Sequence, residues 1–239
     1  MQIEYGLSVP VGTLSQINFG AFNRIVILGV STPTSMQEIE AIVASYLANF
    51  QTRFRLDISP LAGPGDVTEL LVARGFQESP RLIAKSWRYL DALPPLDSNF
   101  VVREVAVDHV DQWSKLSRDA WGLPRQFGPW FKATVGVNGF YHVGVFEDNH
   151  LIAGAALFAS DGLGWAGFAA TMPNYQGRGL QLALLKKRLH IAASLGCEIV
   201  HTESETGTPE APSPTLRNLK NIGMERIYDM RLFEMNLAG

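Results

Sequence analysis

The chain has 239 residues, of which 46% are hydrophobic and 18% are charged, and its formal net charge is −3. This balance is rich enough for a packed core and excludes a disordered chain. Without a long basic run, neither nucleic acid nor an anionic membrane is an expected partner. Cys197 is the single cysteine, which excludes an intrachain disulfide and suits a reducing compartment. Residues 1–5 lack the start of a signal peptide, so we expect a cytoplasmic protein.

The first half of the chain alternates between strand and helix patterns. In chain order, the patterns predict a strand at 22–30, a helix at 36–49, a strand at 53–58, a helix at 66–74 closed by Gly75, and a strand at 82–90. Residues 91–99 follow, with Pro94 and Pro95, and have neither a helical nor a strand period. We therefore predict two domains, 1–95 and 96–239.

The second half begins with a predicted strand at 100–105 and a helix at 108–120 capped by Asp108. Residues 122–139 show no regular pattern. Two strands at 141–147 and 151–159 form a predicted hairpin across residues 148–150, and a third strand follows at 164–171. The remaining predicted elements are a helix at 179–195, a strand at 198–203, a helix at 215–222 closed by Gly223, and the last strands within 225–235.

The helix predicted at 179–195 is amphipathic. Its apolar positions recur at steps of three and four residues, and this spacing predicts one buried stripe. The stripe consists of Leu182, Leu185, Leu189, Ala192 and Gly196, while Lys186, Lys187 and His190 fall outside it.

Residues 171–181 connect the third strand of the hairpin sheet to this helix and contain Gly177 and Gly179. Glycines leave backbone N–H groups accessible, and a helix N-terminus adds unpaired N–H groups and a positive dipole end, so the segment favours a phosphate ligand. A Walker A loop would need Gly-Lys-Ser/Thr, and a dinucleotide loop would need glycine where Leu182 stands. The alternative without a ligand is a plain glycine-rich turn.

The spacing Gln176-x-x-Gly179, preceded by Pro173, resembles the pyrophosphate-binding motif Gln/Arg-x-x-Gly-x-Gly/Ala of the GNAT superfamily of N-acetyltransferases. The sequence departs from the motif at Gln181, where a small residue is usual. The strand ending at Glu203 and the helix closed by Gly223-Met224 also resemble the family's fifth strand and following helix. The resemblance implies an α/β (α+β) GNAT fold, with a mixed, mostly antiparallel sheet flanked by helices.

The first half resembles a partial copy of the second. Gly75-Phe76 closes its second helix as Gly223-Met224 closes the later one, and residues 31–35 stand where the glycine loop would be. We therefore predict a second, smaller and degenerate GNAT-like half without a cofactor site.

The resemblance implies acetyl-CoA as the co-substrate and no metal. The pyrophosphate would lie on the glycine loop, the pantetheine arm along the strand that ends at Thr171, and Asn218 would add a contact. The implied cofactor-binding residues are Ala169, Ala170, Thr171, Gln176, Gly177, Arg178, Gly179, Leu180, Gln181 and Asn218.

Acetylation of an amine needs a base, and His201 and Glu203 share one face of a strand that ends at the family's cleft. The alternatives are an ordinary sheet histidine and a solvated carboxylate. The family's usual acidic tyrosine would fall at Leu219, so Tyr228, Tyr141 or water would replace it. The predicted catalytic residues are Glu203, Tyr228 and His201.

Three functions are considered for these patterns. The first is transfer of an acetyl group from acetyl-CoA to a primary amine of a small molecule or peptide, and the second is a CoA-binding sensor or pseudoenzyme without transfer. The third, a structural protein–protein module, would require no binding of acyl-CoA. Aromatic residues at 113–131 are candidates for the acceptor pocket or for plain core; they are Trp113, Trp121, Phe127, Trp130 and Phe131. The sequence leaves a homodimer open.

Overall fold

The computed structural model describes residues 2–3, 11–13, 20–26, 28, 30, 33–49, 51–63, 66–97, 99–208 and 210–237. The chain divides into two compact units. Unit 1 contains Met1–Ala84, Glu205–Pro212 and Tyr228–Gly239, and unit 2 contains Lys85–Ser204 and Ser213–Ile227. These units do not follow the predicted boundary at residue 95, because the C-terminal strand pairs with a strand of the first half. Whether 1–95 and 96–239 fold as separate domains stays a prediction.

Unit 1 combines short strands with two helices. Its elements are β1 (Gln2–Ile3), β2 (Val11–Thr13), η1 (Gly20–Phe22), β3 (Arg24–Val26), α1 (Met36–Ala48), β4 (Arg53–Ile58), α2 (Asp66–Arg74), and parts of β5 (Gln77–Tyr89) and β11 (Glu225–Asn236). The strand order is β1-β2-β3-β4-β11-β5. β3 and β4 are parallel, whereas β4 and β11 are antiparallel.

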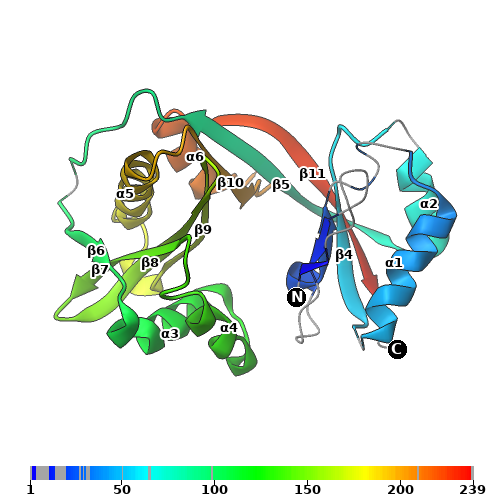
Figure 1. Ribbon diagram of the computed structural model, residues 1–239, viewed down its shortest axis with the longest axis horizontal. Coiled ribbons are helices and arrows are strands. Elements are labelled where there is room, and N and C mark those ends of the chain that lie inside the picture. Colours follow the sequence, from blue (N-terminus) through cyan, green and yellow to red (C-terminus); the bar gives the residue numbers. More distant parts are fainter. Residues whose placement is uncertain are drawn as a thin grey trace. The chain divides into compact units, whose positions relative to one another are not determined.

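The core of unit 1 lies between this sheet and the two helices, α1 and α2 (Figure 1). Ile39 and Val43 of α1 and Leu71 of α2 pack against Phe54 and Leu56 of β4. The ring of Tyr46 stacks on Phe54 with centroids 4.6 Å apart. The predicted helices and the strand at 53–58 are confirmed. Of the strand predicted at 22–30, the structure shows β3 at Arg24–Val26, and residues 27 and 29 lie outside the described residues.

Unit 2 is a larger sheet with helices on both faces. Its elements after β5 are β6 (Val102–Glu104), η2 (Val107–His109), α3 (Val110–Trp121), η3 (Arg125–Phe127), α4 (Gly128–Ala133), β7 (Phe140–Glu147), β8 (His150–Ser160), β9 (Leu163–Thr171), η4 (Pro173–Tyr175), α5 (Leu180–Ser194), β10 (Ile199–Glu205) and α6 (Pro214–Asn221). The strand order is β5-β10-β9-β8-β7-β6, with β9 and β10 parallel. α5 covers one face, and α3 and α4 cover the other (Figure 1).

Several sequence predictions for unit 2 need correction. Asp108 does not cap α3; its carboxylate lies 2.8 Å from Nδ1 of His109, which is the N-cap residue and makes no side-chain cap bond. The segment predicted as irregular contains α4, whose short length hides its period. The last predicted strands are one long strand, β11. The hairpin is confirmed, with Asp148 and Asn149 at φ 47° and 65° in its turn.

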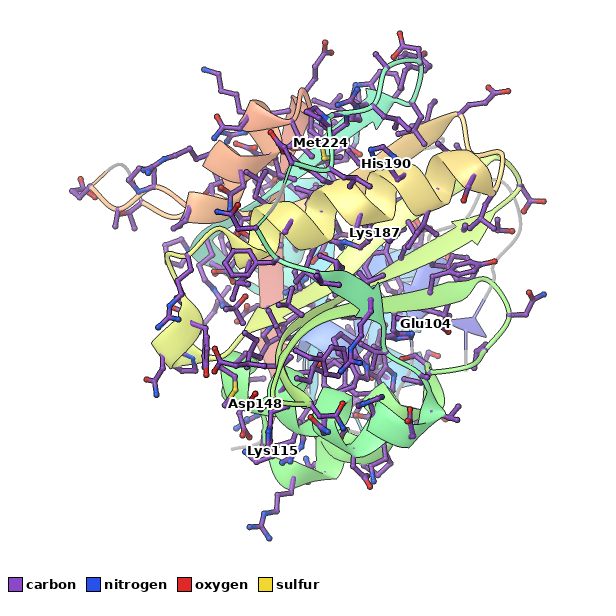
Figure 2. All side chains as sticks on the ribbon, turned by 90° about the vertical axis from the view of Figure 1, so that its left-hand side faces the viewer. Glu104, Lys115, Asp148, Lys187, His190 and Met224 are labelled. Carbon is purple, nitrogen blue, oxygen red and sulfur yellow. The ribbon has the colours of Figure 1, made fainter. Side chains whose placement is uncertain are left out.

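The predicted domain boundary falls within unit 2, where Pro94 and Asp97 both contact α5. Nε2 of His190 lies 2.8 Å from the carbonyl oxygen of Pro94, and Lys186 donates to the carboxylate of Asp97. Figure 2 shows Lys187 and His190 on this helix. These polar contacts explain why Lys186 and His190, which fall outside the predicted stripe, are only half exposed.

The buried face of α5 is wider than the predicted stripe. Leu185, Leu189 and Ala192 are buried as predicted, but Gly196 lies beyond the end of the helix and is exposed. A second row, which the sequence analysis missed, consists of Leu180, Leu184 and Arg188. No helix in the described part of the chain is long and apolar enough to cross a membrane.

Candidate functional site

The loop between β9 and α5 has the backbone of an open anion site. Gln176 is extended, and Gly177 and Gly179 have φ angles of 77° and 86°, a left-handed conformation that favours glycine. A Cβ atom added to either glycine would meet no other atom within 4 Å. The glycines are therefore required by backbone conformation, and the space beside them is free for a ligand.

The start of α5 supplies the electrostatic attraction. Gly179 is the N-cap residue and offers no side-chain cap, so the first N–H groups of the helix are not satisfied by a cap. Together with the positive end of the helix dipole, these groups favour phosphate oxygens.

Hydrogen bonds and a cation–π contact from neighbouring side chains stabilise the conformation of the loop. The guanidinium of Arg178 donates to the carbonyl of Asn174 at 3.2 Å and lies 4.8 Å above the ring of Tyr175. The hydroxyl of Tyr175 donates to Glu147, and this bond raises the pKa of Tyr175 above its ordinary value. The loop is thus tied both to itself and to the end of β7.

Gln181 explains how the loop tolerates a large residue where the motif has a small one. Its Nε2 donates to Oγ1 of Thr215 at 3.0 Å, and its Oε1 accepts from Nδ2 of Asn218 at 2.6 Å. The side chain therefore points to α6 and leaves the loop open. Leu180 is 2% exposed and lies in the core, so only its backbone can face a ligand.

Strands β9 and β10 separate beside this loop. Their parallel register runs from Leu163↔Ile199 to Trp165↔His201, and Oγ1 of Thr202 donates to the carbonyl of Ala166 at 2.6 Å. The register ends there, although β9 continues to Thr171 and β10 to Glu205. Residues Ala169–Thr171 therefore lie where the two strands no longer pair, and an extended ligand could pair with this backbone.

A β-bulge changes the direction of β9 at the same place. The register with β8 shifts between Gly154 and Ala156, and Phe168 has a φ angle of 50°. Phe168 and Ala169 together oppose the single residue Ala155. Bulges of this kind bend a strand and redirect the residues that follow.

His201 and Glu203 share one face of β10, as predicted. Oε1 of Glu203 lies 2.9 Å from Nζ of Lys85, and both side chains are 18% exposed. The pKa of His201 is lowered from its ordinary value, first by desolvation and then by Lys85, and Glu203 opposes the shift. The lowered pKa favours the neutral imidazole, which is the form that can accept a proton.

Tyr228 is the third predicted catalytic residue. Tyr228 belongs to unit 1 and packs there against Ile83, Met230 and Leu232. Its part in catalysis stays a prediction. Leu219, at the position of the family's tyrosine, is 3% exposed and belongs to the core of unit 2.

Aromatic rings gather on the face of the sheet that α3 and α4 cover. The ring of Phe168 lies 4.8 Å from Trp165, 5.0 Å from Trp130 and 5.8 Å from Trp121, measured between centroids. Nε1 of Trp121 donates to the carbonyl of Ala169 at 3.3 Å, and this indole is 41% exposed.

The predicted aromatic set therefore divides into two groups. Trp113, Phe127 and Phe131 are buried core residues, whereas Trp121 and Trp130 keep exposed surface. Trp165 and Phe168 were not predicted from the sequence. A signal for Trp165 was present in the sequence, because alternate residues of a strand face the same side and the predicted strand at 164–171 contains Trp165.

Comparison with known proteins identifies the domain that carries this site. Residues 103–212 match the model of the acetyltransferase (GNAT) family. This part of the chain is therefore a GNAT acetyltransferase domain, a family whose members transfer acyl groups from acyl-CoA. A comparison with curated proteins found no match.

Solved structures show the same fold over a longer stretch. A GCN5-related N-acetyltransferase from Kribbella flavida matches with a TM-score of 0.70 and 18% identity, covering 100% of this chain and 90% of its own. One from Sphaerobacter thermophilus matches with a TM-score of 0.66 and 17% identity, over 84% of this chain and 66% of its own.

A tandem GNAT protein from the clavulanic acid biosynthesis pathway matches with a TM-score of 0.57 and 18% identity, over 85% of this chain and 68% of its own. The GNAT fold class is confirmed, and the first half also has a GNAT-like fold.

Proposed function

We propose that this protein binds acetyl-CoA in unit 2 and transfers the acetyl group to a primary amine of a small molecule or peptide. The observation that carries the proposal is the open glycine loop at the start of α5, next to the point where β9 and β10 separate. An open glycine loop and a stretch of β9 that no longer pairs with β10 lie side by side, which suits a ligand with a pyrophosphate and an amide-containing arm.

The residues of the loop fit this co-substrate. The backbone of Gln176–Gln181 would hold the pyrophosphate, and that of Ala169–Thr171 would pair with the pantetheine arm. The side chain of Gln181 is turned away and keeps Asn218 beside the loop. When bound, the thioester supplies an electrophilic carbonyl carbon and a thiol leaving group.

The acceptor needs a base, since a free alkyl ammonium has a pKa of about 10. Glu203 and the neutral His201 lie on one face of β10, two residues apart. Glu203 attracts the ammonium and, directly or through water, accepts its proton, and its Oε1 also lies 2.9 Å from Nζ of Lys85. His201 is the second candidate on this face.

The aromatic surface supports an amine carried by an apolar, planar body. Trp165 shares its face with His201, and Trp121 is bonded to Ala169, so an acceptor near these groups contacts Trp121, Trp130 and Phe168. The Glu203–Lys85 pair offers little net charge for a polyamine.

A CoA-binding protein without transfer is the second candidate. Two observations favour it: Leu219 replaces the family's tyrosine, and Glu203 is paired with a lysine. Two measurements separate the functions. Isothermal titration with CoA tests binding, and release of free thiol from acetyl-CoA with a panel of arylalkylamines, amino sugars, polyamines and peptides tests transfer. Binding without thiol release supports the sensor, and no binding at millimolar CoA contradicts both.

A further inference from the structure

Arg188 is a buried cation in the middle of α5. It follows Leu180 and Leu184 on the helix face that packs on the sheet, and it is 3% exposed. Desolvation lowers the pKa of Arg188 to about 10. No carboxylate pairs with it among the described residues. An isolated charge in a core is costly, so the bonds that Arg188 does make must hold it there.

Three backbone carbonyls accept hydrogen bonds from the guanidinium. Nε donates to Leu184 of the same helix at 3.3 Å. Nη1 donates to Ala156 of β8 at 3.0 Å and to Gly167 of β9 at 3.1 Å. Ala156 and Gly167 are register partners across the two strands, and they form the pair directly before the register shifts.

The pair Ala156–Gly167 lies directly next to the point where β9 departs from regular pairing with β8. Phe168, the next residue, adopts the left-handed backbone region that is strained for a residue with a side chain. Without the bulge, the residues after Gly167 would each move to the opposite face of the sheet. A donor that holds both carbonyls of the last regular pair keeps the bulge at Phe168 rather than elsewhere.

Arg188 suits this task better than an apolar residue. Methionine would fill the same space without the cost of a buried charge, but it would leave the two carbonyls without these donors. Lysine keeps the charge yet lacks the planar, fixed arrangement of N–H groups. The guanidinium therefore contributes its hydrogen bonds rather than its volume.

We propose that Arg188 is a positioning residue that fixes the bulge of β9 and thereby directs the backbone of Ala169–Thr171 toward the acyl-CoA arm. The proposal rests on the proposed function, because it assigns this backbone to the co-substrate. It assigns Arg188 no contact with any substrate.

The test compares Arg188→Met and Arg188→Lys with Lys187→Met, which removes a neighbouring cation of the same helix that makes no bond to β8 or β9. Three readouts are needed: titration with ADP as a probe of the phosphate loop alone, kcat and KM for acetyl-CoA, and the backbone amide signals of Phe168 and Ala169 in ¹H–¹⁵N spectra.

For Arg188→Met we expect ADP affinity within about twofold of wild type and kcat/KM lower by about 10- to 100-fold, since small misplacements cost rates of this order. The kcat/KM of Arg188→Lys should lie between the values of Arg188→Met and wild type, and that of Lys187→Met should match wild type.

The outcomes separate this proposal from the proposed function. A folded Arg188→Met protein with wild-type kcat, KM and amide signals overturns the proposal, and so does an equal loss of ADP binding and turnover, which indicates general damage to unit 2. If Arg188→Met does not fold, Arg188→Lys decides by the same readouts. If wild type binds no CoA and releases no thiol, the proposed function fails, and the amide signals alone decide whether Arg188 fixes the bulge.

Discussion

The two units start a helix after a strand in opposite ways. In unit 1, Ser35 precedes α1 and its Oγ accepts a hydrogen bond from the N–H of Glu38 at 3.1 Å. In unit 2, Gly179 precedes α5 with no side-chain cap. The first helix therefore has a side chain that caps one of its first N–H groups, whereas the second has none. This difference is a physical argument for the prediction that the first half holds no cofactor.

The two units also differ in how a buried charge is stabilised. The side chain of Asp57 in unit 1 is fully buried. Its carboxylate forms ion pairs with Nε of Arg55 at 2.6 Å and with Nη1 of Arg24 at 3.0 Å, so its charge is paired within the unit. Among the described residues, the partners that hold Arg188 of unit 2 are three carbonyls and no carboxylate. Unit 1 uses its buried ion to join β3 and β4, and unit 2 uses its buried ion beside a bulge near the candidate site.

The largest expected effect comes from closing the open helix start. Gly179→Glu places a carboxylate and a Cβ atom at a position with φ of 86°, where the phosphate would lie. We expect CoA binding to be lost in isothermal titration. The matched control is Ser35→Gly at the start of α1, which should leave CoA affinity unchanged. Wild-type affinity in the Gly179→Glu protein would contradict the proposed site.

The second effect concerns the base on β10. Glu203→Gln keeps the shape of the side chain and removes its charge, so we expect turnover to fall by about 100- to 10,000-fold with CoA affinity nearly unchanged. The loss should be largest at low pH, and kcat measured across pH 6–9 tests it. Unchanged turnover over this range rejects Glu203.

In that case His201→Gln becomes the decisive variant. Because desolvation lowers the pKa of His201, the imidazole stays unprotonated below the ordinary histidine range. Activity that depends on His201 would therefore persist as the pH falls through 6.5 and decline only below it.

The third effect tests the paired ion of unit 1. Asp57→Ala leaves Arg24 and Arg55 without their carboxylate, and breaking a buried pair of this kind costs about 3 kcal/mol. Denaturant unfolding should show a lower midpoint for the transition of this unit. CoA affinity, measured under native conditions, should not change. A parallel loss of CoA affinity would indicate that unit 1 takes part in the site.

The sequence predicted most elements because their local signals agree. Periodicity, the Asp148-Asn149 turn and the glycines at 177 and 179 each specify backbone geometry within a few residues. The same locality explains what was missed. α4 is too short to show a period, and the bulge at Phe168 has no turn residue to indicate it.

Contacts distant in sequence were also beyond prediction. Lys85 pairs with Glu203 only because β5 lies next to β10 in the sheet. Arg188 follows leucines at helical spacing, but a charged residue on such a face is predicted only when its carbonyl partners are known. The bond of Gln181 to Asn218 likewise depends on how α6 packs near α5.

The smallest expected effect is the cap of α1, and it sharpens the comparison of the two helix starts. Ser35→Ala removes the oxygen that accepts from Glu38, and loss of such a cap costs about 1 kcal/mol. The corresponding change in unit 2, Gly179→Ser, offers α5 a side-chain cap but forces a non-glycine residue into a left-handed conformation. Denaturant unfolding measures both changes. If the uncapped N–H groups of α5 take no part in ligand binding, the Gly179→Ser protein should keep its CoA affinity. If the uncapped donors form the phosphate site, the serine competes with the ligand, and CoA affinity should fall while Ser35→Ala leaves it unchanged.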